Sequence, residues 1–175
     1  MQQGLIELYC GDGKGKTTAA LGLILRASGR GLKVLLCQFL KGRVTGELNS
    51  LALLPQVKIL RGKALTKFTF QMNEAEKLQV LKDHQNLLQQ ARELCQNGQV
   101  DLLVLDEAVG ACALALLDEE SLLDFLAKKP AGMEIVLTGR NPSPKLLASA
   151  DYVSEIKKRK HPFDKGITAR EGIEY

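Results

Sequence analysis

The stretch at residues 11–18, Gly11-Asp12-Gly13-Lys14-Gly15-Lys16-Thr17-Thr18, stands between a short apolar run at 5–10 and a helical pattern at 16–28. Glycines let backbone N–H groups turn toward phosphate oxygens, and the following helix adds the positive end of its dipole. Lys16 adds a point charge, and the Thr17 hydroxyl is suited to Mg²⁺. Strand, loop and helix come in the order that a phosphate loop requires, which weakens the alternative of a turn that binds nothing. We expect all eight residues to bind a nucleoside triphosphate.

The loop departs from the usual Gly-x-x-x-x-Gly-Lys-[Ser/Thr] spacing in two ways. Cys10 stands where that pattern has its first glycine, which comes one residue later at Gly11, and an extra lysine, Lys14, lies inside the loop. Lys14 is interpreted equally well as a phosphate contact and as a solvated surface charge. The loop therefore indicates a nucleoside triphosphate and leaves the reaction open.

Strand-like and helical segments alternate along the chain. Helices are expected at residues 16–28, 74–96, 111–117, 119–127 and 144–149, and strands at residues 5–10, 34–39, 57–60, 102–105, 134–138 and 152–156. Continuously apolar strands are typical of a parallel sheet that is covered on both faces. We therefore predict an α/β fold: a single P-loop domain of RecA-like type over residues 1–175, with a mostly parallel sheet and helices on both faces.

Two acidic residues, Asp106 and Glu107, follow the apolar run at 102–105. A carboxylate at the carboxyl end of a parallel strand beside a phosphate loop can hold Mg²⁺, directly or through water. We expect Thr17, Asp106 and Glu107 to form a metal site, with solvated acids at a strand end as the alternative. Arg140 leaves a later strand at the same edge, where it can neutralise phosphate charge unless it is an ordinary surface arginine. The candidate catalytic residues are Lys16, Glu107 and Arg140.

The composition excludes several classes of protein. Of 175 residues, 45% are hydrophobic, which excludes a disordered chain. The net charge of +4, from 24 Lys and Arg against 20 Asp and Glu, does not indicate the dense basic stripe of a nucleic-acid binder. Four irregularly spaced cysteines and two histidines favour neither a zinc site nor a disulfide framework. No run reaches membrane-spanning length and no leader is evident, so we expect a cytoplasmic protein without nucleic-acid or membrane partners.

Short motifs continue in order from the loop to the last residue. After Ala19-Ala20 they are Gln38-Phe39-Leu40-Lys41-Gly42, Val104-Leu105-Asp106-Glu107, Thr138-Gly139-Arg140, His161-Pro162-Phe163-Asp164-Lys165-Gly166 and Gly172-Ile173-Glu174-Tyr175. Together with the loop, they closely resemble the ATP:cob(I)alamin adenosyltransferases of the CobA, CobO and BtuR type. The resemblance covers nearly the whole chain, and it makes the shifted glycine and Lys14 features of a family.

The resemblance implies a transferase that moves the 5′-deoxyadenosyl group of ATP to the cobalt of a reduced corrinoid and releases triphosphate. The corrinoid would be cob(I)alamin or cob(I)yrinic acid a,c-diamide, and the pathway adenosylcobalamin biosynthesis or salvage. Mg²⁺ or Mn²⁺ as cofactor, a homodimer and a flavoprotein electron donor are implied as well. Since Co(I) is itself the nucleophile, Lys14, Lys16, the loop amides and a metal on Thr17 and Glu107 are left to stabilise the triphosphate.

The segment Lys67-Phe68-Thr69-Phe70 matches, on the same resemblance, an aromatic pair that displaces the lower axial ligand of the corrinoid. Relatives carry Trp at the second place, where this chain has Phe70. Aromatic residues spaced by one share a side of an extended segment, so Phe68 and Phe70 are expected to face the corrin together. Two ordinary strand residues are the alternative.

Two other functions stay open. One is a RecA-like ATPase in which Glu107 polarises a water for attack on the γ-phosphate. The other is a nucleotide-dependent switch or adaptor. The basic run at residues 157–160 is most simply a solvated face.

Overall fold

A six-stranded parallel sheet forms the centre of the protein. The computed structural model describes residues 3–42, 45–62, 67 and 69–175. The strand order is β3-β2-β4-β5-β1-β6, and every hydrogen-bonded pair runs parallel. The strands are β1 (Ile6–Cys10), β2 (Val34–Gln38), β3 (Val57–Arg61), β4 (Leu102–Asp106), β5 (Glu134–Thr138) and β6 (Tyr152–Glu155).

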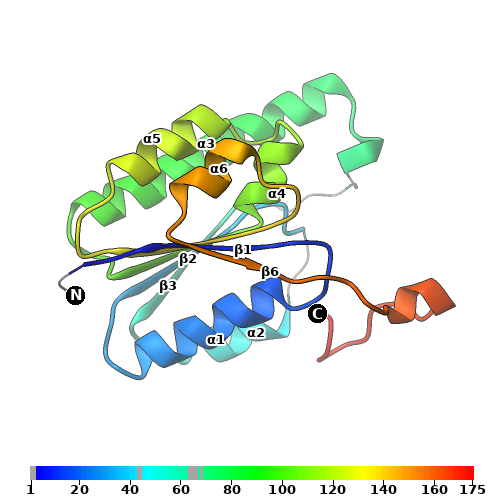
Figure 1. The fold of residues 1–175 in the computed structure, drawn as a ribbon, viewed down its shortest axis with the longest axis horizontal. Helices are drawn as coiled ribbons and strands as arrows, with labels where there is room; N and C mark the ends of the chain where they lie inside the picture. The colour runs from blue at the N-terminus through cyan, green and yellow to red at the C-terminus, as the bar shows by residue number, and fades with distance from the viewer. Residues whose placement is uncertain (1–2, 43–44, 63–66, 68) are drawn as a thin grey trace.

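Helices cover both faces of this sheet (Figure 1). On one side are α1 (Lys16–Ser28) and α2 (Gly46–Leu51); on the other are α3 (Glu74–Gln96), α4 (Ala108–Ala113), α5 (Glu119–Ala127) and α6 (Pro144–Ser149). Two short 3-10 helices, η1 (Thr69–Gln71) and η2 (Pro162–Lys165), lie outside these layers. Each helical layer has its own apolar core against the sheet. The predicted fold class, α/β with a parallel sheet between helices, is confirmed.

The sequence explains how these elements form. All five residues of β4 are buried, as a continuously apolar central strand requires. In α1, Ala20, Ile24 and Ala27 recur at three- and four-residue steps and face the sheet. The helix α3 begins at a capping box, in which the Asn73 side chain accepts from the Glu76 N–H and the Glu76 carboxylate accepts from the Asn73 N–H.

One predicted helix has different bounds in the structure, and two further features were not predicted. The helix expected at 111–117 is α4, which begins three residues earlier because Glu107 adopts a left-handed backbone (φ 61°) directly after β4, and the chain turns again at Ala115 (φ 54°). The six-residue helix α2 was not predicted, since it is too short to show a helical period. The last strand is exposed along its whole length, because β6 is an edge strand.

No helix within the described residues combines the length and the mean hydropathy that crossing a membrane requires. The single domain over residues 1–175 and the cytoplasmic location stay predictions.

Candidate nucleotide and metal site

The loop between β1 and α1 rests on the segment that follows β6. Gly11 (φ 102°) and Gly15 (φ 123°) have left-handed backbones. A Cβ on Gly11 would lie 2.4 Å from the Ile156 carbonyl oxygen, and the Gly13 N–H donates to that same oxygen at 2.7 Å. The close approach of the Ile156 backbone therefore requires glycine at positions 11 and 13, in addition to any contact that these residues make with phosphate.

Lys16 is buried at the start of α1. Its ammonium donates to the carbonyl oxygens of Gly11 and Gly13, both at 2.8 Å. Burial and then the nearby charge of Arg140 lower the pKa of Lys16. The loop backbone thus holds the ammonium of Lys16 through two hydrogen bonds.

Asp106 accepts hydrogen bonds from both sides of the site. Its Oδ1 lies 2.8 Å from the Thr17 Oγ1, which is 89 residues away in sequence, and 2.7 Å from the Thr138 Oγ1. The strand β5 separates β4 from β1, so the side chains of Thr17 and Asp106 meet across an intervening strand. The side chain of Asp106 is fully buried, and the loop threonine contacts this carboxylate of β4 directly.

Glu107 continues this network. Its N–H donates to the Thr138 Oγ1 at 2.9 Å, while the Thr138 hydroxyl donates to Asp106. Burial raises the pKa of Glu107, and the charge of Asp106 raises it further, whereas the charge of Lys41 acts in the opposite direction. The Lys41 ammonium lies 3.5 Å from the Asp106 Oδ2. The charges of Lys41, Lys16 and Arg140 therefore partly neutralise this pair of adjacent carboxylates.

An open cleft of about 640 Å³ lies above these residues. Its lining includes the loop from Asp12 to Thr18, together with Glu107 and Arg140. Gly11 does not line this cleft, and Asp106 is reached through its hydrogen bond with Thr17. The loop, Asp106, Glu107 and Arg140 are thus gathered at one edge of the sheet. Their individual roles in binding nucleotide or metal stay predictions.

Asp12 supports the loop. Its Oδ1 accepts from the Lys158 N–H at 2.9 Å, and this bond is the largest cause of the lowered pKa of Asp12. The basic run at 157–160 is therefore joined to the loop through its backbone, which the sequence did not suggest.

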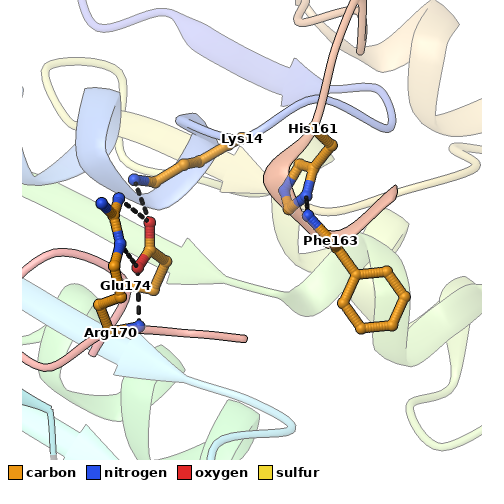
Figure 2. Close-up of polar contacts among 5 residues, drawn as sticks. All are labelled: Lys14, His161, Phe163, Arg170 and Glu174. Carbon is orange, nitrogen blue, oxygen red and sulfur yellow. Dashed lines mark hydrogen bonds and ion pairs between the residues drawn. The ribbon is translucent and has the colours of Figure 1, made fainter. Parts of the chain in front are cut away.

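Residues 172–175, the last of the chain, also line the cleft, and so does His161. Figure 2 shows the Lys14 ammonium directed at Glu174, at 3.1 Å from its Oε1, and the Arg170 guanidinium on the same carboxylate. The Arg170 N–H and Nε also donate to the Glu174 Oε2, at 2.8 and 3.1 Å. In the same view, the His161 Nδ1 accepts from the Phe163 N–H at 3.2 Å.

Phe70 lies apart from this cleft. It belongs to η1, ahead of α3, and its side chain is 81% exposed. The expected extended geometry is wrong at Phe70, because Thr69–Gln71 forms a turn of 3-10 helix in which alternate residues do not share a side. Phe68 lies outside the described residues. Phe70 is not among the residues that line the cleft.

Several residues of the site were not assigned a role from the sequence: Gln38, Lys41, Thr138, His161 and Glu174. All five belong to motifs that carried the family resemblance. The available signal was position, since polar residues at the carboxyl ends of neighbouring parallel strands meet at one edge. Sequence spacing alone could not show which of them point inward.

The donors present fit a magnesium ion. Thr17 supplies a hydroxyl, Asp106 and Glu107 supply carboxylates, and the buried Gln38 Oε1 has no hydrogen-bond partner among the described residues. Within the same residues, no group of three or more His, Cys, Asp or Glu is arranged to hold a metal. Mg²⁺ usually keeps several waters and takes oxygens from substrate phosphates, so one or two carboxylates would suffice to hold it.

Comparison with known proteins identifies the family of this chain. A family model described as ATP:corrinoid adenosyltransferase BtuR/CobO/CobP matches residues 2–175. The chain is 34% identical to the corrinoid adenosyltransferase of Escherichia coli K12 and to the corrinoid adenosyltransferase CobA of Salmonella typhimurium, over 99% of this chain and 87% of each relative. It is 31% identical to the corrinoid adenosyltransferase of Pseudomonas aeruginosa, over 99% of this chain and 85% of that protein. The chain is therefore a transferase that belongs to the ATP:corrinoid adenosyltransferase family BtuR/CobO/CobP.

Proposed function

We propose that this protein transfers the 5′-deoxyadenosyl group of ATP to the cobalt of a reduced corrinoid and releases inorganic triphosphate. The observation that carries the proposal is the 2.8 Å hydrogen bond between Thr17 and Asp106, which joins the loop to the carboxylate edge beneath a cleft lined by Lys14, Lys16 and Arg140. Family membership supports the corrinoid as acceptor. Cob(I)alamin and cob(I)yrinic acid a,c-diamide are the two forms proposed, in adenosylcobalamin biosynthesis or salvage.

The reaction makes one bond and breaks one. An electron pair on Co(I) forms the bond to C5′ of the ribose, and the C5′–O5′ bond breaks with its electron pair on the leaving triphosphate. No proton has to move, so the protein needs no nucleophilic side chain or general base. What it has to supply is alignment of C5′ with cobalt and stabilisation of the growing negative charge.

The cations of the cleft are suited to that task. Lys16 sits at the loop, Arg140 faces it from the carboxyl end of β5, and Lys14 lies at the rim. Mg²⁺ or Mn²⁺ held by Thr17, Asp106 and Glu107 would add positive charge at the triphosphate oxygens. Burial raises the pKa of Glu107 and so disfavours its charged form, an effect that a bound cation would offset.

The corrinoid is proposed to bind beside the segment at 67–71. Phe70 exposes 81% of its side chain there, and a large exposed aromatic suits contact with a macrocycle. Its proposed role, with Phe68, is to displace the lower axial ligand and so ease reduction of Co(II). A homodimer and a flavoprotein electron donor complete the proposal on the basis of the family resemblance.

The test is to incubate the protein with ATP, Mg²⁺ and a chemically reduced corrinoid. Visible absorption follows the cobalt–carbon bond, and chromatography separates triphosphate from ADP. We expect alkylcobalt and triphosphate in equal amounts. Lys16→Ala is the control, because it removes the loop charge and should bind no nucleotide while leaving the circular dichroism spectrum unchanged.

The other outcomes point to different functions. Accumulation of ADP and phosphate without an alkylcobalt spectrum would indicate a RecA-like ATPase. Slow turnover, together with a partner whose binding depends on nucleotide, would indicate a switch or adaptor.

A further inference from the structure

A buried histidine with no part in the proposed chemistry lies in the middle of α3. His84 is 3% exposed. Its Nδ1 lies 2.8 Å from the Leu116 carbonyl oxygen, and its Nε2 lies 3.4 Å from the Leu40 nitrogen. A backbone N–H only donates and a carbonyl only accepts, so both contacts are hydrogen bonds only in the neutral tautomer with the proton on Nδ1. Burial, which lowers the pKa of His84, favours the same neutral form.

The bond to Leu40 falls at an unusual point of the backbone. Leu40 follows β2 and has a left-handed conformation (φ 53°), which residues with a Cβ seldom adopt. The residue before it is held as well, because the Phe39 N–H donates to the Asp106 carbonyl oxygen at 2.9 Å. The His84 ring packs edge-to-face on Phe39, with ring centroids 5.3 Å apart. One imidazole therefore contacts two successive residues of the turn that leaves β2.

That turn delivers Lys41 to the site. The side chain of Lys41 is 23% exposed, and its ammonium lies 3.5 Å from the fully buried Asp106 carboxylate. Lys41 also lines the nucleotide cleft and acts electrostatically on Glu107. Because Lys41 is one residue beyond Leu40, a change in the Leu40 backbone redirects its side chain.

We propose that His84 is a positioning residue that fixes the left-handed turn at Leu40 and thereby holds Lys41 against the Asp106–Glu107 carboxylates. The proposal rests on the function proposed above for this cleft. It assigns a role in nucleotide binding to a residue of α3 that does not line the cleft.

The two ring nitrogens can be imitated separately. The amide of His84→Asn reaches the place of Nδ1 and keeps the donation to Leu116, but it leaves the Leu40 N–H without an acceptor. The amide oxygen of His84→Gln reaches the place of Nε2 and keeps that acceptor, but it loses the Leu116 bond. Each variant loses the ring and one of its two hydrogen bonds, so they form a matched pair.

The measurement is the dissociation constant of Mg·ATP by calorimetry, without corrinoid. We expect His84→Asn to weaken binding about fivefold or more and His84→Gln to stay within about twofold of the wild type. In a Lys41→Met background, His84→Asn should add less than about twofold, because the two residues act through one contact. Equal weakening by Asn and Gln, or a full effect of His84→Asn without Lys41, would overturn the proposal.

A second measurement keeps the proposal testable if His84→Asn does not fold. Nitrogen NMR of the wild-type imidazole should show a protonated Nδ1 and an unprotonated Nε2 at neutral pH, and the opposite tautomer would overturn the proposal. These readouts are separate from adenosyl transfer. If the wild type binds Mg·ATP but forms no alkylcobalt product, the proposed function fails while the role of His84 in binding is still decided by the variants.

Discussion

The Lys14 ammonium lies 3.1 Å from the Glu174 carboxylate, although 160 residues separate them in the chain. Lys14 is the lysine that distinguishes this loop from the usual phosphate loop, and Glu174 is the penultimate residue of the sequence. The ion pair places the last segment of the chain along the wall of the nucleotide cleft. Lys14 therefore already has an anionic partner, at the mouth of a cleft that is proposed to take a triphosphate.

Glu174→Gln should tighten ATP binding. The glutamate competes with phosphate for Lys14 and repels the triphosphate, and removal of its charge relieves both effects. Exposed ion pairs are weak, so we expect a decrease of about two- to fivefold in the dissociation constant. Calorimetry measures it. Glu171→Gln is the matched control, since it changes the net charge equally on an exposed residue of the same segment. An unchanged or weaker affinity for Glu174→Gln alone would refute the competition.

The carboxyl group of Glu174 should titrate at unusually low pH. Hydrogen bonds from Arg170, and then from Lys14, lower the pKa of Glu174 to about 2. Because the folded pKa is below the ordinary value, the stabilisation is present above the ordinary pKa and is lost as the pH falls through about 2. Carbon NMR of the side chain should show no titration between about pH 5 and about pH 3.5 in the wild type. In Arg170→Ala the same carboxyl should titrate within that range.

Thr138→Val should damage the metal site without touching nucleotide. It removes the hydroxyl that donates to Asp106 and accepts from the Glu107 N–H. We expect the free energy of unfolding to fall by about 1–3 kcal/mol. The Mg²⁺ concentration for half-maximal activity should rise about tenfold. Thr138→Ser keeps the hydroxyl and serves as the control. A similar Mg²⁺ requirement in all three proteins would show that this hydroxyl does not support the carboxylates.

Phe70→Ala should act mainly on the reduction step. If Phe70 displaces the lower ligand, turnover that starts from Co(II) should fall about tenfold, while turnover from preformed Co(I) stays within about twofold. Phe70→Trp enlarges the aromatic surface and should raise the rate from Co(II). Because the side chain is largely exposed, stability should change by less than about 0.5 kcal/mol. Equal losses from both starting states would contradict the role of Phe70.

His84 should make stability depend on pH. Its folded pKa is lowered, so the unfolded chain binds more protons just below the ordinary histidine pKa of about 6.5. The stabilisation is therefore complete above that pH and is lost as the pH falls toward the folded value. The slope due to His84 is at most about 1.4 kcal/mol per pH unit. Chemical denaturation of the wild type and of His84→Gln, compared between about pH 7.5 and about pH 5.5, isolates the contribution of His84. If the free energy of unfolding changes equally with pH in both proteins, that contribution is excluded.

The architecture was accessible from the sequence because its strands are strongly apolar and its helices carry local signals. The helix at 74–96 has the predicted bounds, since the Asn73 cap and its period are local features. The helix after Glu107 was misplaced because its start depends on a bond between Glu107 and Thr138, a residue of another strand. No local pattern records that bond.

The candidate site likewise combines features that the sequence predicts with contacts that only the structure shows. The sequence alone determined the glycine-rich loop between strand and helix, the carboxylate pair after an apolar strand, the α/β fold class and the family, because each depends on residue types in a local pattern. Only the tertiary structure decided that Thr17 and Asp106 meet across β5, that Glu174 pairs with Lys14, and that His84 supports the turn before Lys41. Those contacts join residues 44 to 160 positions apart. They depend on how strands and helices pack, and not on their order along the chain.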